Sequence, residues 1–385
     1  MKKVKDFSIV FISDSKKFME MMDFIEMFPE ISIDMEADGF YAYKARPCLW
    51  QLCVEDDVKK YVFLVDPISC KKNDELPMSQ LFGNQNILKL FHGSEYDFQM
   101  IYETYGIVPK NIEDTKIAAD LLGCESPGLD NLLKDFLNID IKKTKKLQRA
   151  NWAKRPLSKQ LIDYAALDVL HLVDLRNELL KELKKKERLD WYFEECIIYQ
   201  NSIPPMQEII TKQHSHKIKG AKKLSPSQLL ILEAVFQTRE EICKKRNLAS
   251  FRLLGNQYLL DIAKNYDAYK DVFPKKMDRR LKGRFVAAIK SVKKQNQPLP
   301  KFSPPKRKKY RKGPDKLTKP IRDLRLEKSK KMKILPGVIL PGRILNAIAI
   351  EQPQTLKDLY EIKGMRKWQI EILGKELLES ISKIK

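Results

Sequence analysis

The sequence predicts a mixed α/β domain followed by two small all-helical domains. Three strand-like runs follow one another closely after residue 30, and strands then alternate with helices up to about residue 200. Beyond that point only helical periodicity remains, and 385 residues exceed one ordinary domain. We expect an α/β domain at 1–205, a linker at 206–223, a helical domain at 224–297, a basic Pro/Lys-rich linker at 298–320 and a second helical domain at 321–385.

Apolar periodicity defines the elements of the α/β domain. It predicts strands at 31–37, 49–55, 59–67 and 87–93, a short strand passing into a helix at 111–123, and helices at 95–106, 128–139 and 157–186. Gly106 is placed to end the first of these helices, and Ser158 is placed as the N-cap of the last one. Strands and helices in this order form a sheet with mixed strand directions.

Acidic side chains recur where this scheme puts strand ends and helix faces. Asp34 and Glu36 share one face of the first strand, because side chains alternate with a period of two. Asp97 begins a helix, and Tyr164 and Asp168 lie one helical turn apart. Such oxygen ligands suit Mg²⁺ or Mn²⁺, and two such ions would relieve the repulsion between the carboxylates and support phosphodiester hydrolysis.

The charge of the chain indicates a polyanionic partner. A formal net charge of +22 most often accompanies nucleic-acid binding, and the alternative is a lysine-rich composition without functional meaning. No apolar run reaches the roughly 18 residues that a membrane span needs, and no signal-peptide core follows the first residues. We therefore expect a cytoplasmic protein that does not bind membranes.

Three segments carry a family resemblance: "IDMEAD", "LFHGSEYDFQMIYETYGIVPKNIEDTKIAADLL" and "LQRANWAKRPLSKQLIDYAALDVLHLVDL". Together they resemble the ribonuclease D family of DEDD-type 3′-5′ exoribonucleases, tyrosine subclass. The resemblance implies a ribonuclease H-like sheet and two divalent metal ions, with Tyr164 aligning the attacking water. The ligands that it implies are Asp34, Glu36, Asp97 and Asp168. Many relatives have aspartate where this chain has Asn151. We expect this difference to change only local hydrogen bonding.

The helical tail resembles the HRDC domain, a small nucleic-acid-binding module. The segment "LILEAVFQTREEICKKRNLASFRLLGNQYLLDIAKNYD" fits its opening helices, and "ILPGRILNAIAIEQPQTLKDLYEIKGMRKWQIEILGKELL" resembles a second, more divergent copy. The phosphate-binding pattern GxxxxGK[ST] is absent from the sequence, which argues against the helicases that share this module.

Several other residues are candidates for substrate contacts. His92 either approaches the terminal nucleotide or satisfies buried backbone groups. A basic run before the last helix is expected to contact phosphates, and we single out Lys145, Arg149 and Arg155 within it. The run comprises Lys142, Lys143, Lys145, Lys146, Arg149, Lys154 and Arg155. Trp152 is expected to pack inside the domain, and Asp114 is expected to cap a helix.

The predicted activity is hydrolysis of RNA from a free 3′ hydroxyl, releasing nucleoside 5′-monophosphates. The resemblance implies that tRNA precursors or other structured RNAs with free 3′ ends are the substrates, and we expect a monomer. Two alternatives remain: a 3′-5′ DNA exonuclease, and an RNA-binding scaffold that has lost its nuclease activity. The presence of all four acids and the tyrosine argues against the scaffold.

Overall fold

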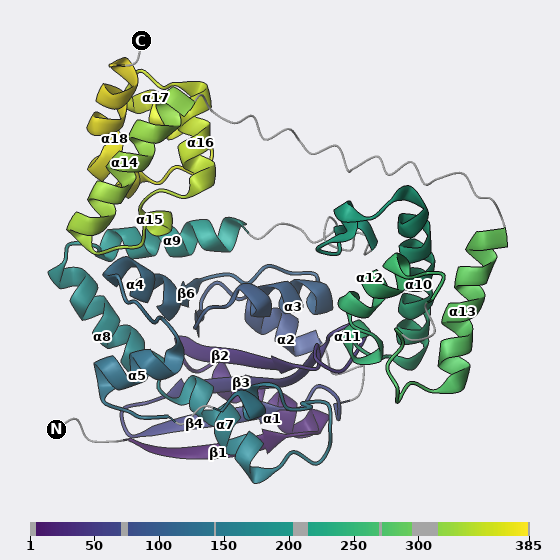
Figure 1. Cartoon of the computed structure of the whole chain (residues 1–385). Helices are drawn as coiled ribbons and strands as arrows, with labels where there is room; N and C mark the ends of the chain where they lie inside the picture. Colours follow the sequence, from purple (N-terminus) through teal and green to yellow (C-terminus); the bar gives the residue numbers. More distant parts are fainter. Residues whose placement is uncertain are drawn as a thin grey trace.

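The computed structural model describes residues 5–70, 76–141, 144–202, 215–268, 272–294 and 315–383. Lys142, Lys143 and most of the two predicted linkers lie outside the described residues. Figure 1 shows a sheet domain with two separate groups of helices, one beside the sheet domain within residues 226–294 and one above α9 (Leu189–Ser202) within residues 315–382. The predicted succession of one α/β region and two helical regions is confirmed.

The first region is built on a six-stranded mixed sheet of order β1-β4-β3-β2-β5-β6. Its strands are β1 (Asp6–Ile12), β2 (Glu30–Ala37), β3 (Pro47–Glu55), β4 (Lys59–Val65), β5 (Leu88–Phe91) and β6 (Ile112–Asp114). β3 runs antiparallel to β2 and β4, and the other neighbouring pairs are parallel. The sequence analysis missed β1, an edge strand whose side chains are mostly exposed or half-buried and therefore show little apolar alternation.

Nine helices surround this sheet in the described part of the chain. They are α1 (Ser15–Ile25), α2 (Leu76–Gly83), α3 (Glu95–Tyr105), α4 (Thr115–Leu122), α5 (Leu129–Leu137), α6 (Lys145–Gln148), α7 (Lys159–Leu170), α8 (Leu172–Lys185) and α9 (Leu189–Ser202). The predicted caps are confirmed, since Gly106 ends α3 in the left-handed region and the Ser158 side chain accepts a hydrogen bond at the start of α7. The sequence analysis did not predict α1, α2, α6 or α9.

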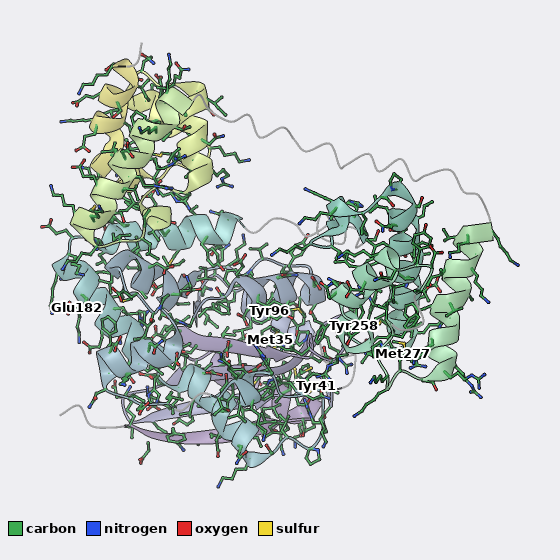
Figure 2. The ribbon with its side chains drawn as sticks, in the orientation of Figure 1. Met35, Tyr41, Tyr96, Glu182, Tyr258 and Met277 are labelled. Atoms are coloured by element: carbon green, nitrogen blue, oxygen red, sulfur yellow. The ribbon has the colours of Figure 1, made fainter. Side chains whose placement is uncertain are left out.

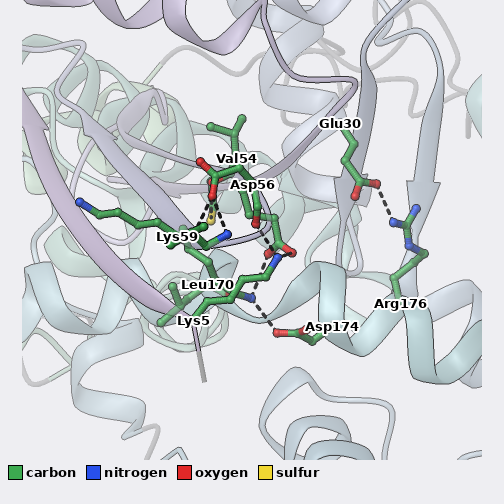
Figure 3. Close-up of polar contacts among 12 residues, drawn as sticks. Lys5, Glu30, Val54, Asp56, Lys59, Leu170, Asp174 and Arg176 are labelled. Atoms are coloured by element: carbon green, nitrogen blue, oxygen red, sulfur yellow. Dashed lines mark hydrogen bonds and ion pairs between the residues drawn. The ribbon is translucent and has the colours of Figure 1, made fainter. Parts of the chain in front are cut away.

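The single helix predicted at 157–186 is wrong, because the chain breaks at His171 into α7 and α8. Lys60 on β4 explains the break. Its buried ammonium donates to the carbonyl oxygen of Leu170 at 2.9 Å and to Asp174 at 2.6 Å, so it binds the end of one helix and the start of the next (Figure 3). Burial opposes the charge of Lys60, but its hydrogen bonds to Asp174 and Glu55 outweigh this and raise the pKa.

The pleat of β2 directs its acidic side chains toward α7. Met35 pairs with Trp50 on β3, whose indole donates to the hydroxyl of Tyr105 at 3.2 Å on the side covered by α3. Asp34 and Glu36 therefore lie on the opposite face of the sheet. That face is covered by α7, which packs against β2, β3 and β4 (Figure 1).

A buried ion pair connects the sheet to the segment before α7. The guanidinium of Arg155 holds both oxygens of Asp66, which follows β4, at 2.6 and 2.7 Å. Its remaining N–H groups donate to the carbonyl oxygens of Trp152, Lys154 and Cys48 at 2.6, 3.1 and 2.8 Å. All five guanidinium donors are thus used within the protein.

The two helical regions have separate hydrophobic cores. The first contains α10 (Pro226–Arg246), α11 (Ser250–Leu253), α12 (Asn256–Lys264) and α13 (Arg279–Lys294), and we call it the first helical unit. The second contains α14 (Asp315–Met332), α15 (Pro336–Ile339), α16 (Gly342–Glu351), α17 (Leu356–Glu361) and α18 (Lys367–Ser382), and we call it the second helical unit. α14 begins before the boundary predicted at 321, because Pro320 lies inside the helix instead of preceding it.

The second helical unit is packed tightly onto α9. Trp368, only 1% exposed, stacks on Trp191 with ring centroids 4.6 Å apart and planes inclined by 17°. Glu195 accepts hydrogen bonds from the guanidinium of Arg366 at 2.9 and 3.1 Å and from the Trp368 indole at 3.0 Å. Glu194 accepts from two backbone N–H groups at the start of α18, where the helix dipole favours a negative charge. The arginine and the tryptophan of the segment "GMRKWQ" therefore make contacts within the chain.

We expect Trp368→Ala to lower the free energy of unfolding by about 4 kcal/mol, because it removes a fully buried aromatic ring. Urea unfolding followed by tryptophan fluorescence and circular dichroism measures the change. Tyr360→Ala is the control, since this α17 side chain is 53% exposed and its removal should change stability by less than about 0.5 kcal/mol. Equal effects of the two substitutions would contradict the docking role of Trp368.

Asp66→Asn should lower the free energy of unfolding by about 3 kcal/mol at neutral pH, because it leaves the Arg155 charge without its partner. Burial alone would raise the pKa of Asp66, but the bonds from Arg155 and Ser69 outweigh it and lower the pKa. The pair therefore stabilises the fold above the unfolded-state pKa of about 3.9, and this contribution is lost as pH falls through the folded-state pKa. Urea titrations at pH 7 and pH 3.5 should show the difference between the two proteins shrinking at the lower pH.

Candidate active site

One cavity contains most of the predicted site residues. Its volume is about 230 Å³, and it opens over the β2 face that α7 covers. Its lining residues are Ile33, Asp34, Met35, Glu36, His92, Leu129, Gln148, Tyr164, Asp168 and Leu172. Three carboxylates and a phenol thus meet in a space to which, among the described residues, no lysine or arginine contributes a lining side chain.

Strand register explains how the carboxylates reach this cavity. The parallel pairing of β2 with β5 ends at Ser32, so Asp34 and Glu36 extend past the end of β5. Both remain paired with β3, and the register shifts just after Glu36. His92 follows the last residue of β5 directly. The carboxyl ends of neighbouring parallel strands are where open α/β sheets place their ligand sites.

Tyr164 is held between the carboxylates and the segment before α7. Its ring lies 6.0 Å from that of Trp152, and the side chain of Gln148 is hydrogen-bonded to it. Burial raises the pKa of Tyr164 well above the usual value, and the negative charges of Asp168, Glu36 and Asp34 raise it further. The electrostatic potential at the phenol is therefore negative, which favours a cation nearby.

Asp97, the fourth predicted acid, is buried at the start of α3. It lies in the first turn of α3, is 8% exposed, and is not among the residues that line the cavity. Burial raises the pKa of Asp97 to about 7, although its carboxylate accepts a bond from its own N–H, and the charge of Asp114 adds to the increase. The structure thus joins Asp34, Glu36, Tyr164 and Asp168 in one cavity, and the ligand role of Asp97 stays a prediction.

Asp114 positions the turn between β5 and α3. As predicted, it caps α4, since its carboxylate accepts from the N–H of Lys116 at 2.8 Å. It also accepts from the N–H groups of Gly93 and Ser94 at 2.8 and 2.9 Å and from the Ser94 hydroxyl at 2.8 Å. Gly93 has a φ of 69°, a conformation that favours glycine. The sequence analysis missed this second function, which fixes the segment carrying His92 and Asp97.

His92 lies in the cavity with one ring nitrogen already occupied. Its Nδ1 is 2.8 Å from the hydroxyl of Thr115, which donates its own proton to the carbonyl oxygen of Phe91 at 3.1 Å. The hydroxyl therefore accepts from Nδ1–H. The two interpretations of His92 are compatible, and its contact with the substrate stays a prediction.

Some residues of the basic run are exposed, whereas Arg155 is hydrogen-bonded within the protein. Lys145 and Arg149 are exposed beside the cavity residue Gln148, as a phosphate contact requires. All five donors of Arg155 are used inside the protein, which argues against the phosphate contact that we predicted for it. Trp152 is fully buried, which confirms its packing role. The Asn151 side chain accepts from the N–H of Ala153 at 3.2 Å, a local hydrogen bond as expected.

No group of three or more His, Cys, Asp or Glu side chains among the described residues forms a ready-made cage for a metal ion. Magnesium sites commonly use one or two carboxylates and complete the coordination with water and substrate phosphates. Asp34, Glu36 and Asp168 in a negative cavity fit this type of site. Within the described ranges, no helix is both long and apolar enough to span a membrane.

Two family models match the chain. Residues 9–184 match the 3′-5′ exonuclease family, and residues 315–381 match the HRDC domain. The first range contains the whole cavity described above. The second coincides with the second helical unit, which we expected to be the more divergent copy.

Curated relatives are ribonucleases D. The chain is 29% identical over 255 residues to ribonuclease D of Haemophilus influenzae, an alignment covering 66% of this chain and 62% of the relative. It is 26% identical over 360 residues to ribonuclease D of Nitrobacter hamburgensis, covering 91% and 89% of the two chains. It is 30% identical to ribonuclease D of Sphingobium indicum, covering 66% and 63%. The chain thus spans less than two thirds of the length of the first and third of these relatives.

Solved structures share the architecture along nearly the whole chain. Escherichia coli RNase D, described as an exoribonuclease involved in structured RNA processing, superposes with a TM-score of 0.66 at 20% identity and covers 98% of this chain and 99% of its own. A protein from Bifidobacterium adolescentis gives a TM-score of 0.73 at 18% identity, with coverage of 97% and 96%. These matches confirm the mixed-sheet, ribonuclease H-like exonuclease fold. Residues 9–184 therefore match the 3′-5′ exonuclease family, residues 315–381 match the HRDC domain, and the chain is similar in sequence to proteins named ribonuclease D.

Proposed function

We propose that this chain is a metal-dependent 3′-5′ exoribonuclease that removes nucleoside 5′-monophosphates from RNA. The observation that carries the proposal is the convergence of Asp34, Glu36 and Asp168 with Tyr164 in one cavity of an exonuclease domain. The relatives named ribonuclease D support RNA as the substrate. Precursors of tRNA are the RNAs that the family resemblance favours.

The cavity residues have different roles in the proposed reaction. Asp34, Glu36 and Asp168 would hold two Mg²⁺ or Mn²⁺ ions, with Asp97 as a fourth ligand. When bound, such ions lower the pKa of water and stabilise the leaving oxygen in an in-line phosphodiester displacement. Tyr164 orients the attacking water through its hydroxyl, because a phenol with a raised pKa keeps its proton at neutral pH.

The size of the cavity supports attack at a chain end. The carboxylates line a cavity of about 230 Å³, and a base-paired end would have to separate for its last phosphodiester to reach them. Exposed Lys145 and Arg149 beside the cavity supply positive charge for the phosphates that follow. The overall charge of +22 attracts RNA over longer distances.

The reaction is tested by digesting 5′-labelled single-stranded RNA, with and without a 3′ phosphate, in Mg²⁺, Mn²⁺ or EDTA. We expect a ladder that shortens from the 3′ end, requires the metal and is slowed by the 3′ phosphate. Parallel digestion of a DNA strand of the same sequence separates a ribonuclease from a DNA exonuclease, since only contacts with the 2′ hydroxyl distinguish the two. RNA binding without cleavage in either metal would favour the scaffold alternative.

Asp168→Asn should reduce hydrolysis by at least about a thousandfold while RNA binding in EDTA persists, because the amide removes a negatively charged metal ligand. Asp163→Asn is the matched control: it makes the same chemical change on an exposed position of the same helix and should retain full activity. Near-wild-type turnover of the Asp168 variant would refute the assignment.

Tyr164→Phe should lower kcat by about a hundredfold with little change in KM, because it removes only the hydroxyl that orients the water. The ring keeps its contact with Trp152, so thermal stability should be nearly unchanged. Steady-state kinetics on a short RNA, together with a melting curve, separates these effects. A large increase in KM at constant kcat would instead assign Tyr164 to substrate binding.

A further inference from the structure

The loop at 38–46, between β2 and β3, joins the active-site strand to the first helical unit. The carbonyl oxygen of Tyr41 accepts from the N–H of Ala249 at 2.9 Å, and the guanidinium of Arg252 lies 3.7 Å from the centroid of the Tyr41 ring. At the start of the loop, the buried carboxylate of Asp38 accepts two hydrogen bonds from Arg46. The loop is therefore held in place at its base and at its tip.

Exposed aromatic rings gather around this loop. Phe40 is 46% exposed, and its ring meets that of Phe251 edge to face at 6.4 Å and 83°. Phe251, on α11, is 57% exposed, and the guanidinium of Arg149 lies 5.8 Å from the Phe40 ring. Tyr96 is 46% exposed. Its hydroxyl lies close to Gly39 of the loop, 3.3 Å from the position that a Cβ atom on this glycine would occupy. Figure 2 labels Tyr41 and Tyr96 on the side of the domain that faces the first helical unit.

This group of residues lies beside the cavity. Phe40 follows Glu36 by four residues, so their Cα atoms are at most about 14 Å apart. Arg149 is the direct neighbour of the cavity residue Gln148 in the chain, and Tyr96 directly precedes Asp97, the fourth predicted ligand. We call the five residues Phe40, Tyr96, Arg149, Phe251 and Arg252 the aromatic rim.

The composition of the aromatic rim matches single-stranded nucleic acid. Base stacking on aromatic side chains and nearby arginines together bind single strands without strong sequence preference. Contacts between the domain and the first helical unit explain why the rings are near each other. These contacts do not explain why about half of each ring remains exposed. A purely structural contact would gain stability by burying more of the ring surface.

We propose that the aromatic rim stacks the bases of the single-stranded RNA nucleotides immediately upstream of the phosphodiester that is cleaved. The proposal rests on the proposed exoribonuclease function and assigns the adjoining substrate subsites to residues from both the exonuclease domain and the first helical unit. Arg149 and Arg252 supply positive charge for the phosphates between those bases. RNA that is too short to reach the rim gains nothing from it.

The test measures how the Phe251→Ala variant hydrolyses two substrates. This substitution lies in the first helical unit, at a distance from the carboxylates. One substrate is a six-nucleotide RNA, and the other is the p-nitrophenyl ester of a nucleoside 5′-monophosphate, which has no upstream nucleotide. We expect KM for the RNA to rise about tenfold with kcat unchanged, and hydrolysis of the ester to stay at the wild-type rate. Tyr360→Ala, an exposed ring on the second helical unit, is the control and should change neither.

Two further comparisons identify stacking as the cause. Phe251→Trp should retain the low KM, whereas Phe251→Leu, which keeps apolar bulk without an aromatic face, should not. A second RNA lacks the bases of the second and third nucleotides from the 3′ end. The wild type should bind this abasic RNA as weakly as Phe251→Ala binds intact RNA. Removing the bases should weaken binding to Phe251→Ala only slightly further.

Two results would overturn the proposal: an unchanged KM for the RNA in Phe251→Ala, or an equal loss on the RNA and on the ester. A wild-type protein that hydrolyses neither substrate would refute the proposed function but not the rim. In that case, fluorescence anisotropy of labelled RNA in EDTA still tests the rim. A dissociation constant about ten times higher for Phe251→Ala supports it, and equal constants reject it.

Discussion

The ion pair between Arg155 and the buried Asp66 connects the sheet to the segment before α7. Asp66 follows β4, and the same guanidinium reaches β3 through the carbonyl oxygen of Cys48. By also holding the carbonyl oxygen of Trp152, it fixes the indole against which Tyr164 rests. The position of the phenol among the carboxylates thus depends on an ionic contact that lies outside the cavity.

The molecule combines two opposite electrostatic requirements. A polyanionic substrate needs a positive surface, which the excess of lysine and arginine supplies. The proposed site of hydrolysis is negative, because Asp34, Glu36 and Asp168 share one cavity with no lining lysine or arginine among the described residues. The divalent cations of the proposed function would reconcile the two, since they would neutralise the carboxylates and offer the phosphodiester a positive surface where the cavity would otherwise repel it.

Local patterns predicted the fold class and most of the site. Alternation placed Asp34 and Glu36 on one strand face, and helical spacing placed Tyr164 beside Asp168. The remaining features depend on contacts distant in sequence. Neither the ion pair of Arg155 with Asp66 nor the hydrogen bonds of Lys60 on both sides of the break at His171 leave a local signature, and the burial of Asp97 is equally invisible in the sequence. Helix α1 could have been found, because its buried residues Phe18, Met21, Met22 and Ile25 follow helical spacing.

The docking of Trp368 on Trp191 has a consequence for how the two helical units evolve. In the second unit, the tryptophan and arginine of "GMRKWQ" face the exonuclease domain, so selection acts on them as it acts on a hydrophobic core. In the first unit, Phe251 and Arg252 remain at the surface, where substitutions cost little stability. Under the proposed function, the first unit therefore has a surface at which RNA contacts can be altered at little cost in stability, whereas equivalent changes in the second unit would disturb its packing on α9.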